Sequence, residues 1–151
     1  MRKELAVALA ILALAVVALA LAPKRGEPEG FERSLVIEVV DGDTFWCYAG
    51  GSEFKVRLAD VDAPELGTAE GEVAKAFLRE LLEGEEVLLD VDDLYRTDRY
   101  GRIVAVAYLP LNSTHCLNVD ALLVEEGYAR SVDYPNEFSP REWCVVCECL
   151  G

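Results

Sequence analysis

The sequence predicts an α+β fold, a five-stranded β-barrel of the OB type with about three added helices, preceded by an N-terminal hydrophobic segment. Two observations support this fold. Five short apolar runs have the composition or alternation of β-strands, and one amphipathic stretch at helical spacing lies between the third run and the fourth. A helix in that place among five strands is the pattern of an OB barrel.

The N-terminal residues 1–22 are set apart from this fold. Residues 5–22 consist of Leu, Ala, Val and Ile without a charge and follow Arg2 and Lys3. Such a run is typical of a signal peptide or a membrane anchor, because it fits an export signal and is just long enough to cross a bilayer. We therefore expect an extracytoplasmic protein, either secreted or anchored to the membrane through residues 5–22.

The rest of the chain divides into a linker and one domain. Residues 23–33 are rich in Pro, Gly and charged side chains and are expected to be a linker. Residues 34–151 have the length of one ordinary domain with a single core. We expect a monomer and infer no protein partner.

The strands are expected at residues 34–40, 45–48, 53–58, 86–91 and 103–109. Asp41-Gly42-Asp43 has turn-forming residues and joins the first two strands, and the glycines of residues 49–52 join the second to the third. This meander places Asp43 at the mouth of a hairpin and Arg57 on the third strand. In a small barrel the two side chains can converge.

Three helices are expected around these strands. Residues 71–83 carry an apolar stripe at helical spacing and end before Gly84, a natural C-terminal residue for a helix. Asn118 can cap a second helix that closes at Gly127. Ser139, followed by Pro and then by Glu, has the pattern of a capping box and predicts a short last helix.

The chain is strongly acidic, with a formal net charge of −14. Proteins that bind long stretches of nucleic acid usually carry a basic surface, because neutralised phosphates release counterions. The charge therefore argues against tight, extended binding of a polyanion. It leaves open a local site at which a divalent cation reverses the field.

Five cysteines leave several possibilities open. Outside the cell they are compatible with one or two disulfides and one remaining thiol. The spacing of the last three, together with the only histidine, His115, which is next to Cys116, would also allow a zinc site, although no second Cys-x-x-Cys pair supports it. The pairing cannot be read from the sequence for the five residues, which are Cys47, Cys116, Cys144, Cys147 and Cys149.

Three charged stretches carry the candidate chemistry. They are Asp-Gly-Asp-Thr at residues 41–44, Arg57 followed by Asp-Ala-Pro-Glu at residues 62–65, and Arg-Thr-Asp-Arg-Tyr-Gly-Arg at residues 96–102. Each stretch alone is an ordinary turn, loop or hairpin tip. Together, in this order and separated by apolar segments, they supply carboxylates, a base and cations for one phosphodiester.

The residue types indicate distinct roles. Asp43 and Asp62 are oxygen donors of the kind that calcium or magnesium binds, and a substrate phosphate would complete a site with so few carboxylates. Glu65 follows on a loop stiffened by proline and can accept a proton from water. Arg57 and Arg102 present planar guanidinium groups to phosphate oxygens, although a salt bridge to a neighbouring acid is the structural alternative.

With these motifs, the chain resembles the staphylococcal nuclease (thermonuclease) family over about residues 34–143. The resemblance implies an OB fold with added helices and a calcium-dependent endonuclease that hydrolyses DNA and RNA, with water attack and a 5′-oxygen leaving group that leave 3′-phosphate ends. On that pattern Asp43, Asp62 and the Ala63 carbonyl would bind Ca²⁺. Glu65 would be the base, with Arg57 and Arg102 on the phosphate.

Two further residues are expected to bind substrate, Arg99 in the third charged stretch and Tyr134, which matches one of the family's nucleotide-contacting tyrosines. The chain departs from the family in the acidic residues after Glu65, where a lysine-rich loop is usual, and in a cysteine-rich C-terminus. Two other interpretations compete with the enzyme. One is a non-catalytic nuclease-like OB-fold module that binds a partner on the cell exterior, and the other is a calcium-stabilised structural domain. Retention of Arg57, Glu65 and Arg102 favours the enzyme.

Overall fold

The computed structural model describes residues 31–149. The predicted signal or anchor segment and most of the predicted linker lie outside the described residues. The last three residues assigned to the linker, 31–33, already belong to the first strand, because they pair with a later strand of the sheet. Within residues 31–149 no helix is long and apolar enough to span a membrane.

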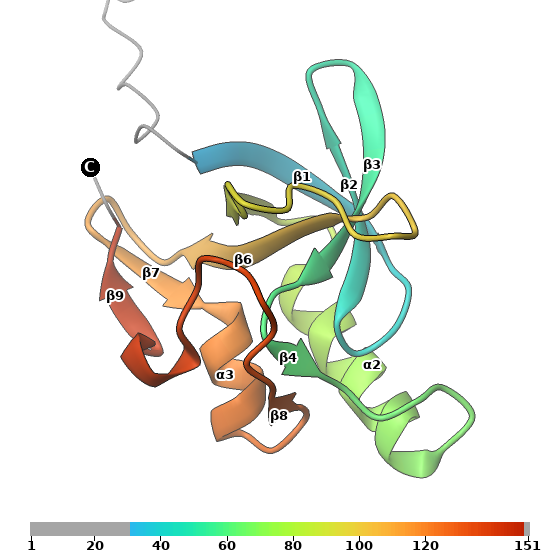
Figure 1. Ribbon diagram of the computed structural model, residues 1–151. Coiled ribbons are helices and arrows are strands. Elements are labelled where there is room, and N and C mark those ends of the chain that lie inside the picture. The colour runs from blue at the N-terminus through green and yellow to red at the C-terminus, as the bar shows by residue number, and fades with distance from the viewer. Residues whose placement is uncertain (1–30, 150–151) are drawn as a thin grey trace, which may run out of the picture.

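Five strands form a closed barrel, as the sequence predicts (Figure 1). Antiparallel pairing runs in the order β3-β2-β1-β5-β6, and a parallel pairing of β3 with β6 closes the ring. A β-bulge between Val36 and Glu38 interrupts the register of the first strand. The barrel strands are β1 (Phe31–Val39), β2 (Thr44–Ala49), β3 (Ser52–Leu58), β5 (Glu86–Val91) and β6 (Ile103–Pro110).

Two α-helices lie at one end of the barrel, α2 (Ala69–Leu82) and α3 (Val119–Glu125) (Figure 1). Asn118 caps α3 through its side chain, as expected, and accepts the Ala121 N–H. The third predicted helix is only a 3₁₀ turn, η1 (Pro140–Glu142), and the Ser139 side chain makes no capping hydrogen bond there. A three-residue turn lacks the length and the buried face that would stabilise an α-helix.

The sequence did not reveal four short strands. They extend the sheet beyond β6 and form a separate two-stranded ladder near the helices. Segments of two to four residues are too short to show an alternating pattern. These strands are β4 (Val61–Asp62), β7 (His115–Asn118), β8 (Arg130–Ser131) and β9 (Val146–Glu148).

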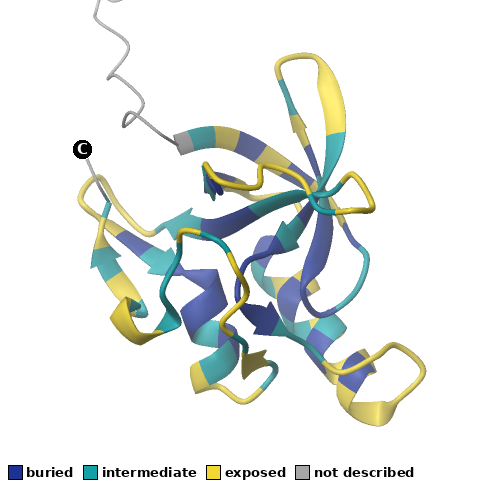
Figure 2. Ribbon diagram, viewed as in Figure 1, coloured by how far each residue is buried: buried dark blue, intermediate teal, exposed yellow. Residues whose placement is uncertain are grey.

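Apolar side chains fill the barrel and the space beneath the helices, while the connections between strands are exposed (Figure 2). The largest buried side chain is Phe45 of β2, and Leu78 of α2 and Leu123 of α3 are equally inaccessible. Phe77 of α2 stacks on Tyr128, just after α3, with ring centroids 4.1 Å apart. This contact ties the two helices together and fixes the segment that leads into β8.

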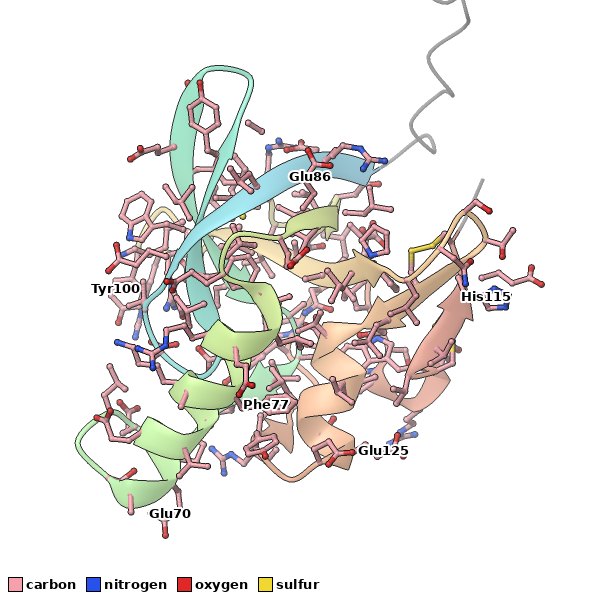
Figure 3. All side chains as sticks on the ribbon, turned by 180° about the vertical axis from the view of Figure 1, so that it is seen from behind. Glu70, Phe77, Glu86, Tyr100, His115 and Glu125 are labelled. Carbon is pink, nitrogen blue, oxygen red and sulfur yellow. A yellow bond between two sulfur atoms is a disulfide. The ribbon has the colours of Figure 1, made fainter. Side chains whose placement is uncertain are left out.

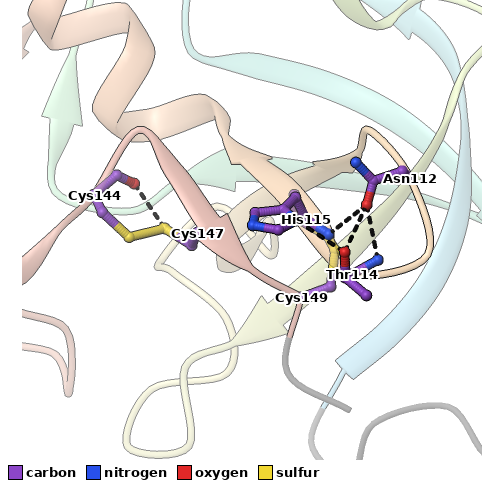
Figure 4. Close-up of a disulfide and its surroundings, with 7 residues drawn as sticks. Asn112, Thr114, His115, Cys144, Cys147 and Cys149 are labelled. Carbon is purple, nitrogen blue, oxygen red and sulfur yellow. Dashed lines mark hydrogen bonds between the residues drawn. A yellow bond between two sulfur atoms is a disulfide. The ribbon is translucent and has the colours of Figure 1, made fainter.

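The cysteines form two disulfides, Cys116–Cys149 and Cys144–Cys147, and leave Cys47 as a buried thiol. Figure 4 shows the bond between Cys144 and Cys147. This agrees with the disulfide expectation and leaves no thiol pair for the zinc alternative. His115 instead shares a hydrogen bond of 2.8 Å with the Thr114 hydroxyl. Burial raises the pKa of the Cys47 thiol to about 12, so this sulfur is an inert part of the core.

Candidate active site

The first charged stretch forms a tight turn between β1 and β2. The Asp43 N–H donates to Asp41 Oδ1 at 3.0 Å, which closes the turn. Gly42 has no room for a side chain, because a Cβ there would lie 2.6 Å from Ala63 Cβ and 2.8 Å from Ala74 Cβ. The glycine therefore lets the turn pack directly against the second charged stretch and against α2.

Asp43 is the buried centre of the site. Its Oδ2 accepts the Ala63 N–H at 2.9 Å, and its Oδ1 accepts the Thr44 hydroxyl at 3.0 Å and lies 3.3 Å from Arg57 Nε. Burial raises the pKa of Asp43 to about 6, although Arg57 and the Ala63 N–H act in the opposite direction. The carboxylate thus carries negative charge that its protein neighbours compensate only in part.

Arg57 holds the chain between the first two charged stretches in place. Its Nη1 donates to the carbonyl oxygens of Leu58 and Val61 at 2.6 and 2.8 Å. Its Nη2 lies 3.7 Å from Asp62 Oδ1. One guanidinium therefore lies between Asp43 and Asp62 and brings both carboxylates to the same end of the barrel.

Asp62 has a second cationic partner that the sequence did not reveal. Arg130 donates from Nε and Nη2 to Asp62 Oδ2, at 2.9 and 2.5 Å. The two residues are also paired in the β4–β8 ladder. The Arg130 side chain is 77% exposed, so the pair lies at the surface of the site.

Glu65 lies on the exposed loop between β4 and α2. Its carbonyl oxygen accepts the Thr68 N–H and hydroxyl at 3.3 and 2.7 Å, and Thr68 in turn caps α2. A Cβ at Gly71 would lie 2.1 Å from the same carbonyl oxygen. The start of α2 therefore fixes the Glu65 backbone, while the carboxylate remains open to solvent.

Glu65 and Asp62 line a cavity of about 510 Å³, together with Ala63, Tyr128 and Arg130. The Glu65 side chain is exposed on this side. Two segments far apart in the sequence, residues 62–65 and 127–130, form the walls. The contact between Phe77 and Tyr128 positions the second of these walls.

The third charged stretch is a turn held by Asp98. Asp98 Oδ1 accepts the N–H groups of Tyr100 and Arg102 at 2.9 and 3.0 Å, and Oδ2 accepts Arg102 Nε at 2.7 Å. Burial alone would raise the pKa of Asp98, but these donors outweigh it and the net pKa is lowered. Arg102 Nη1 also lies 3.5 Å from the Thr44 hydroxyl, so this turn reaches the Asp43 side of the site.

A second cavity, of about 490 Å³, lies on this side, and both Arg57 and Arg102 line it. Arg99 and Tyr134 border the same cavity, together with the exposed Tyr100 ring. The Tyr134 N–H donates to buried Asp60 at 3.0 Å, which anchors the tyrosine's loop to the barrel. The cavity thus combines guanidinium groups with aromatic faces.

Residues 55–144 match the family described as Staphylococcal nuclease homologue. The chain belongs to this family. The match confirms the resemblance and includes the second and third charged stretches, and the closed five-stranded barrel agrees with it.

This staphylococcal nuclease homologue has several curated relatives. A micrococcal nuclease of Shigella flexneri is 38% identical over 106 residues, which cover 68% of this chain and 59% of that protein. Protein ParB of Escherichia coli is 34% identical over 81% of this chain and 65% of its own length. A thermonuclease of Staphylococcus intermedius is 32% identical over 88% of this chain and 84% of its own length. The chain spans 49% to 65% of the length of three of the curated relatives that it matches, the third being an uncharacterized endonuclease of Haemophilus influenzae.

The donor atoms in this nuclease homologue fit a hard divalent cation. Asp43 and Asp62 offer carboxylate oxygens, and the hydrogen bond from the Ala63 N–H to Asp43 brings that peptide beside both. Among residues 31–149 no three carboxylate, histidine or cysteine side chains converge on one point. A cation here would therefore need backbone, water or phosphate oxygens as well, which is the usual environment of calcium and magnesium.

The structure brings most of the predicted site residues into one connected set. Contacts join Asp43 to Arg57 and Ala63, Arg57 to Asp62, and Thr44 to Arg102. Glu65 reaches the set through the cavity that it shares with Asp62. Their roles in catalysis and metal binding stay predictions.

Proposed function

We propose that this staphylococcal nuclease homologue is a metal-dependent nuclease that hydrolyses the phosphodiester bonds of DNA and RNA. The observation that carries the proposal is the convergence of two guanidinium groups and two carboxylates at one end of the barrel. Arg57 pairs with Asp43 and Asp62, and Arg102 reaches Asp43 through the Thr44 hydroxyl. A phosphodiester needs such cations, and the carboxylates suit a metal ion.

The proposed cation is Ca²⁺, held by Asp43, Asp62 and the Ala63 carbonyl. When bound, it would supply positive charge that stabilises the phosphate during attack. The two carboxylates that Arg57 brings together and the all-oxygen donor set support this choice of a hard cation.

The side chains of the chain perform the remaining steps of the proposed reaction. Glu65 accepts a proton from the attacking water as the new P–O bond forms, and the P–O5′ bond breaks. The 5′ oxygen takes a proton from solvent, and the phosphate remains on the 3′ side. Arg57 and Arg102 bind the non-bridging oxygens, on which negative charge develops.

The proposal is tested by cleavage of single-stranded DNA and of RNA in millimolar Ca²⁺ with the domain from Phe31 onward, which keeps β1 whole. We expect cleavage that a chelator abolishes, 3′-phosphate ends, and loss of activity in Glu65→Gln. Glu142→Gln, at an exposed residue of η1, is the control for loss of one carboxylate. If the wild-type protein cleaves no faster than Glu65→Gln but still binds oligonucleotides, the enzyme proposal is wrong and the non-catalytic module is favoured.

We also propose that the protein works outside the cytoplasm, as a monomer. The two disulfides support an oxidising compartment, since such bonds rarely persist in the cytosol. Thiol counting on protein isolated from its host tests the proposed compartment. Four blocked cysteines and one free thiol are expected, and five free thiols would contradict it.

A further inference from the structure

A third hollow lies outside the two cavities of the candidate active site. It has a volume of about 610 Å³ and lies over β2, β3 and the turn that Asp98 holds. Its lining includes the side chains of Trp46, Phe54, Lys55, Tyr100 and Arg102. We call these five residues the Trp46–Lys55 platform.

The platform adjoins the candidate active site through two shared residues. Tyr100 and Arg102 line both this hollow and the cavity that contains Arg57. Figure 3 shows Tyr100 at the edge of the molecule opposite His115, so the platform lies away from the disulfide-linked strands. A chain molecule bound at Arg102 can therefore continue onto the platform without crossing the barrel.

Aromatic rings and cations lie together on this surface, with each cation over the face of a ring. Trp46 and Lys55 are direct partners in the β2–β3 ladder, and Lys55 Nζ lies 4.8 Å from the centre of the Trp46 ring. Tyr100 is 67% exposed, with Arg99 4.7 Å and Arg102 5.3 Å from its ring centre. Such rings stack on bases, and the neighbouring cations pair with phosphates.

The distribution of charge points the same way. The whole chain has a formal net charge of −14. A place where its few basic residues cluster is therefore a candidate site for binding anions. Half of the Lys and Arg residues between 31 and 149 line the three hollows. Exposed Glu53 is the only carboxylate among the residues that line the third hollow. The half that line the hollows are Lys55, Arg57, Arg99, Arg102 and Arg130.

We propose that the Trp46–Lys55 platform is a binding subsite for single-stranded nucleic acid, which takes a nucleotide next to the one at the cleaved phosphodiester. The inference rests on the proposed nuclease function and extends it to substrate selection. Only an unpaired strand can turn its base faces to the Trp46 and Tyr100 rings, because the bases of a duplex stack on one another. The platform therefore favours single strands and substrates longer than a dinucleotide.

The kinetic test compares dithymidylate with octathymidylate as substrates. We expect Trp46→Ala and Lys55→Gln each to raise KM for octathymidylate by about tenfold, with kcat unchanged, because each removes one stacking or phosphate contact. Neither variant should change kcat/KM for dithymidylate. Trp46→Phe keeps an aromatic face and should retain most of the affinity, and Lys75→Gln on α2 is the charge-matched control.

Equal effects on the two substrates, or none on octathymidylate, would overturn the platform. A direct binding measurement separates this failure from failure of the nuclease proposal. In a Glu65→Gln/Trp143→Phe protein Trp46 is the only tryptophan, and octathymidylate should quench its fluorescence. Quenching of this variant, combined with no cleavage by the wild-type protein, would overturn the nuclease proposal alone. Cleavage without quenching would overturn the platform alone, and the absence of both would overturn both.

Discussion

The Thr44 hydroxyl lies 3.5 Å from Arg102 Nη1, across a gap of 58 residues in the sequence. The same hydroxyl donates to Asp43 at 3.0 Å, and Thr44 is also the cross-strand partner of Arg57. A single buried side chain thus connects the proposed metal-binding carboxylate to the cation on the far turn. In the sequence, Thr44 was only the last residue of the Asp-Gly-Asp-Thr turn motif.

Replacing this hydroxyl should weaken the site without unfolding the barrel. Thr44→Val keeps the shape of the side chain but removes the donor to Asp43 and the acceptor for Arg102. We expect kcat/KM for single-stranded DNA to fall by at least about tenfold, since hydrogen bonds to two charged groups are lost. Thr44→Ser should remain close to wild type, and equal activity of the two variants would contradict this role.

Arg130 should compete with a divalent cation for Asp62. Its guanidinium donates twice to Asp62 Oδ2 in the structure, and like charges near one carboxylate repel. We expect Arg130→Ala to bind Ca²⁺ severalfold more tightly than wild type in calorimetric titrations. Arg141→Ala, which removes an exposed cation from η1, is the control. Weaker Ca²⁺ binding in Arg130→Ala would show that the arginine instead holds Asp62 in its binding position.

Gly71 should be intolerant of even a methyl group. An alanine in a helix ordinarily stabilises it by about 0.5–1 kcal/mol relative to glycine. Here the added Cβ would lie 2.1 Å from the Glu65 carbonyl oxygen, so the loop must move. We expect Gly71→Ala to lower both the melting temperature and the cleavage rate. A variant as stable and as active as wild type would contradict the packing described for this loop.

Stability should depend on pH through Asp90. Burial, then the carboxylates of Glu137 and Asp93, raise its pKa to about 6. The folded protein then holds this proton more tightly than the unfolded chain does, so the stabilisation is complete below about pH 4 and is lost as pH rises through about 6.

Asp90→Asn mimics the protonated form at every pH. We expect the variant and the wild type to have the same free energy of unfolding at about pH 4. At about pH 8 we expect the variant to be more stable by about 1 kcal/mol, after discounting for the partial exposure of the side chain. Urea denaturation of the variant and the wild type at the two pH values measures these free energies of unfolding. Glu148→Gln, an exposed change on β9, controls for loss of one negative charge, and a difference independent of pH would contradict the assignment.

The barrel was predictable because its strands carry their own signals. Alternation and β-branched residues marked all five, and helical spacing marked α2 with an error of two residues at its start. The first strand begins three residues earlier than predicted, because its pairing with β5 depends on residues distant in the sequence. The short strands β4, β7, β8 and β9 exist only through such long-range pairing, so no local pattern could reveal them.

The site residues in the charged motifs were likewise visible in the sequence, whereas their supporting residues were not. Arg130 acquires its place through an ion pair with Asp62, 68 residues away, and no motif surrounds it. Gly42 looked like an ordinary turn residue, yet its importance lies in its contact with Ala63 and α2. Close approaches of this kind are properties of the packed fold and leave no periodic trace.

The parallel pairing that closes the barrel also decides when the proposed active site can form. Arg57 on β3 is the register partner of Val104 on β6, two residues after Arg102. The two proposed phosphate-binding arginines therefore meet only when β3 and β6, the two ends of the antiparallel order, join and close the ring. That step is slowed by the entropy of closing the loop between them. A nascent or partly folded chain would contain every residue of the proposed site before the site itself exists, so the recovery of the proposed cleavage during refolding would time barrel closure.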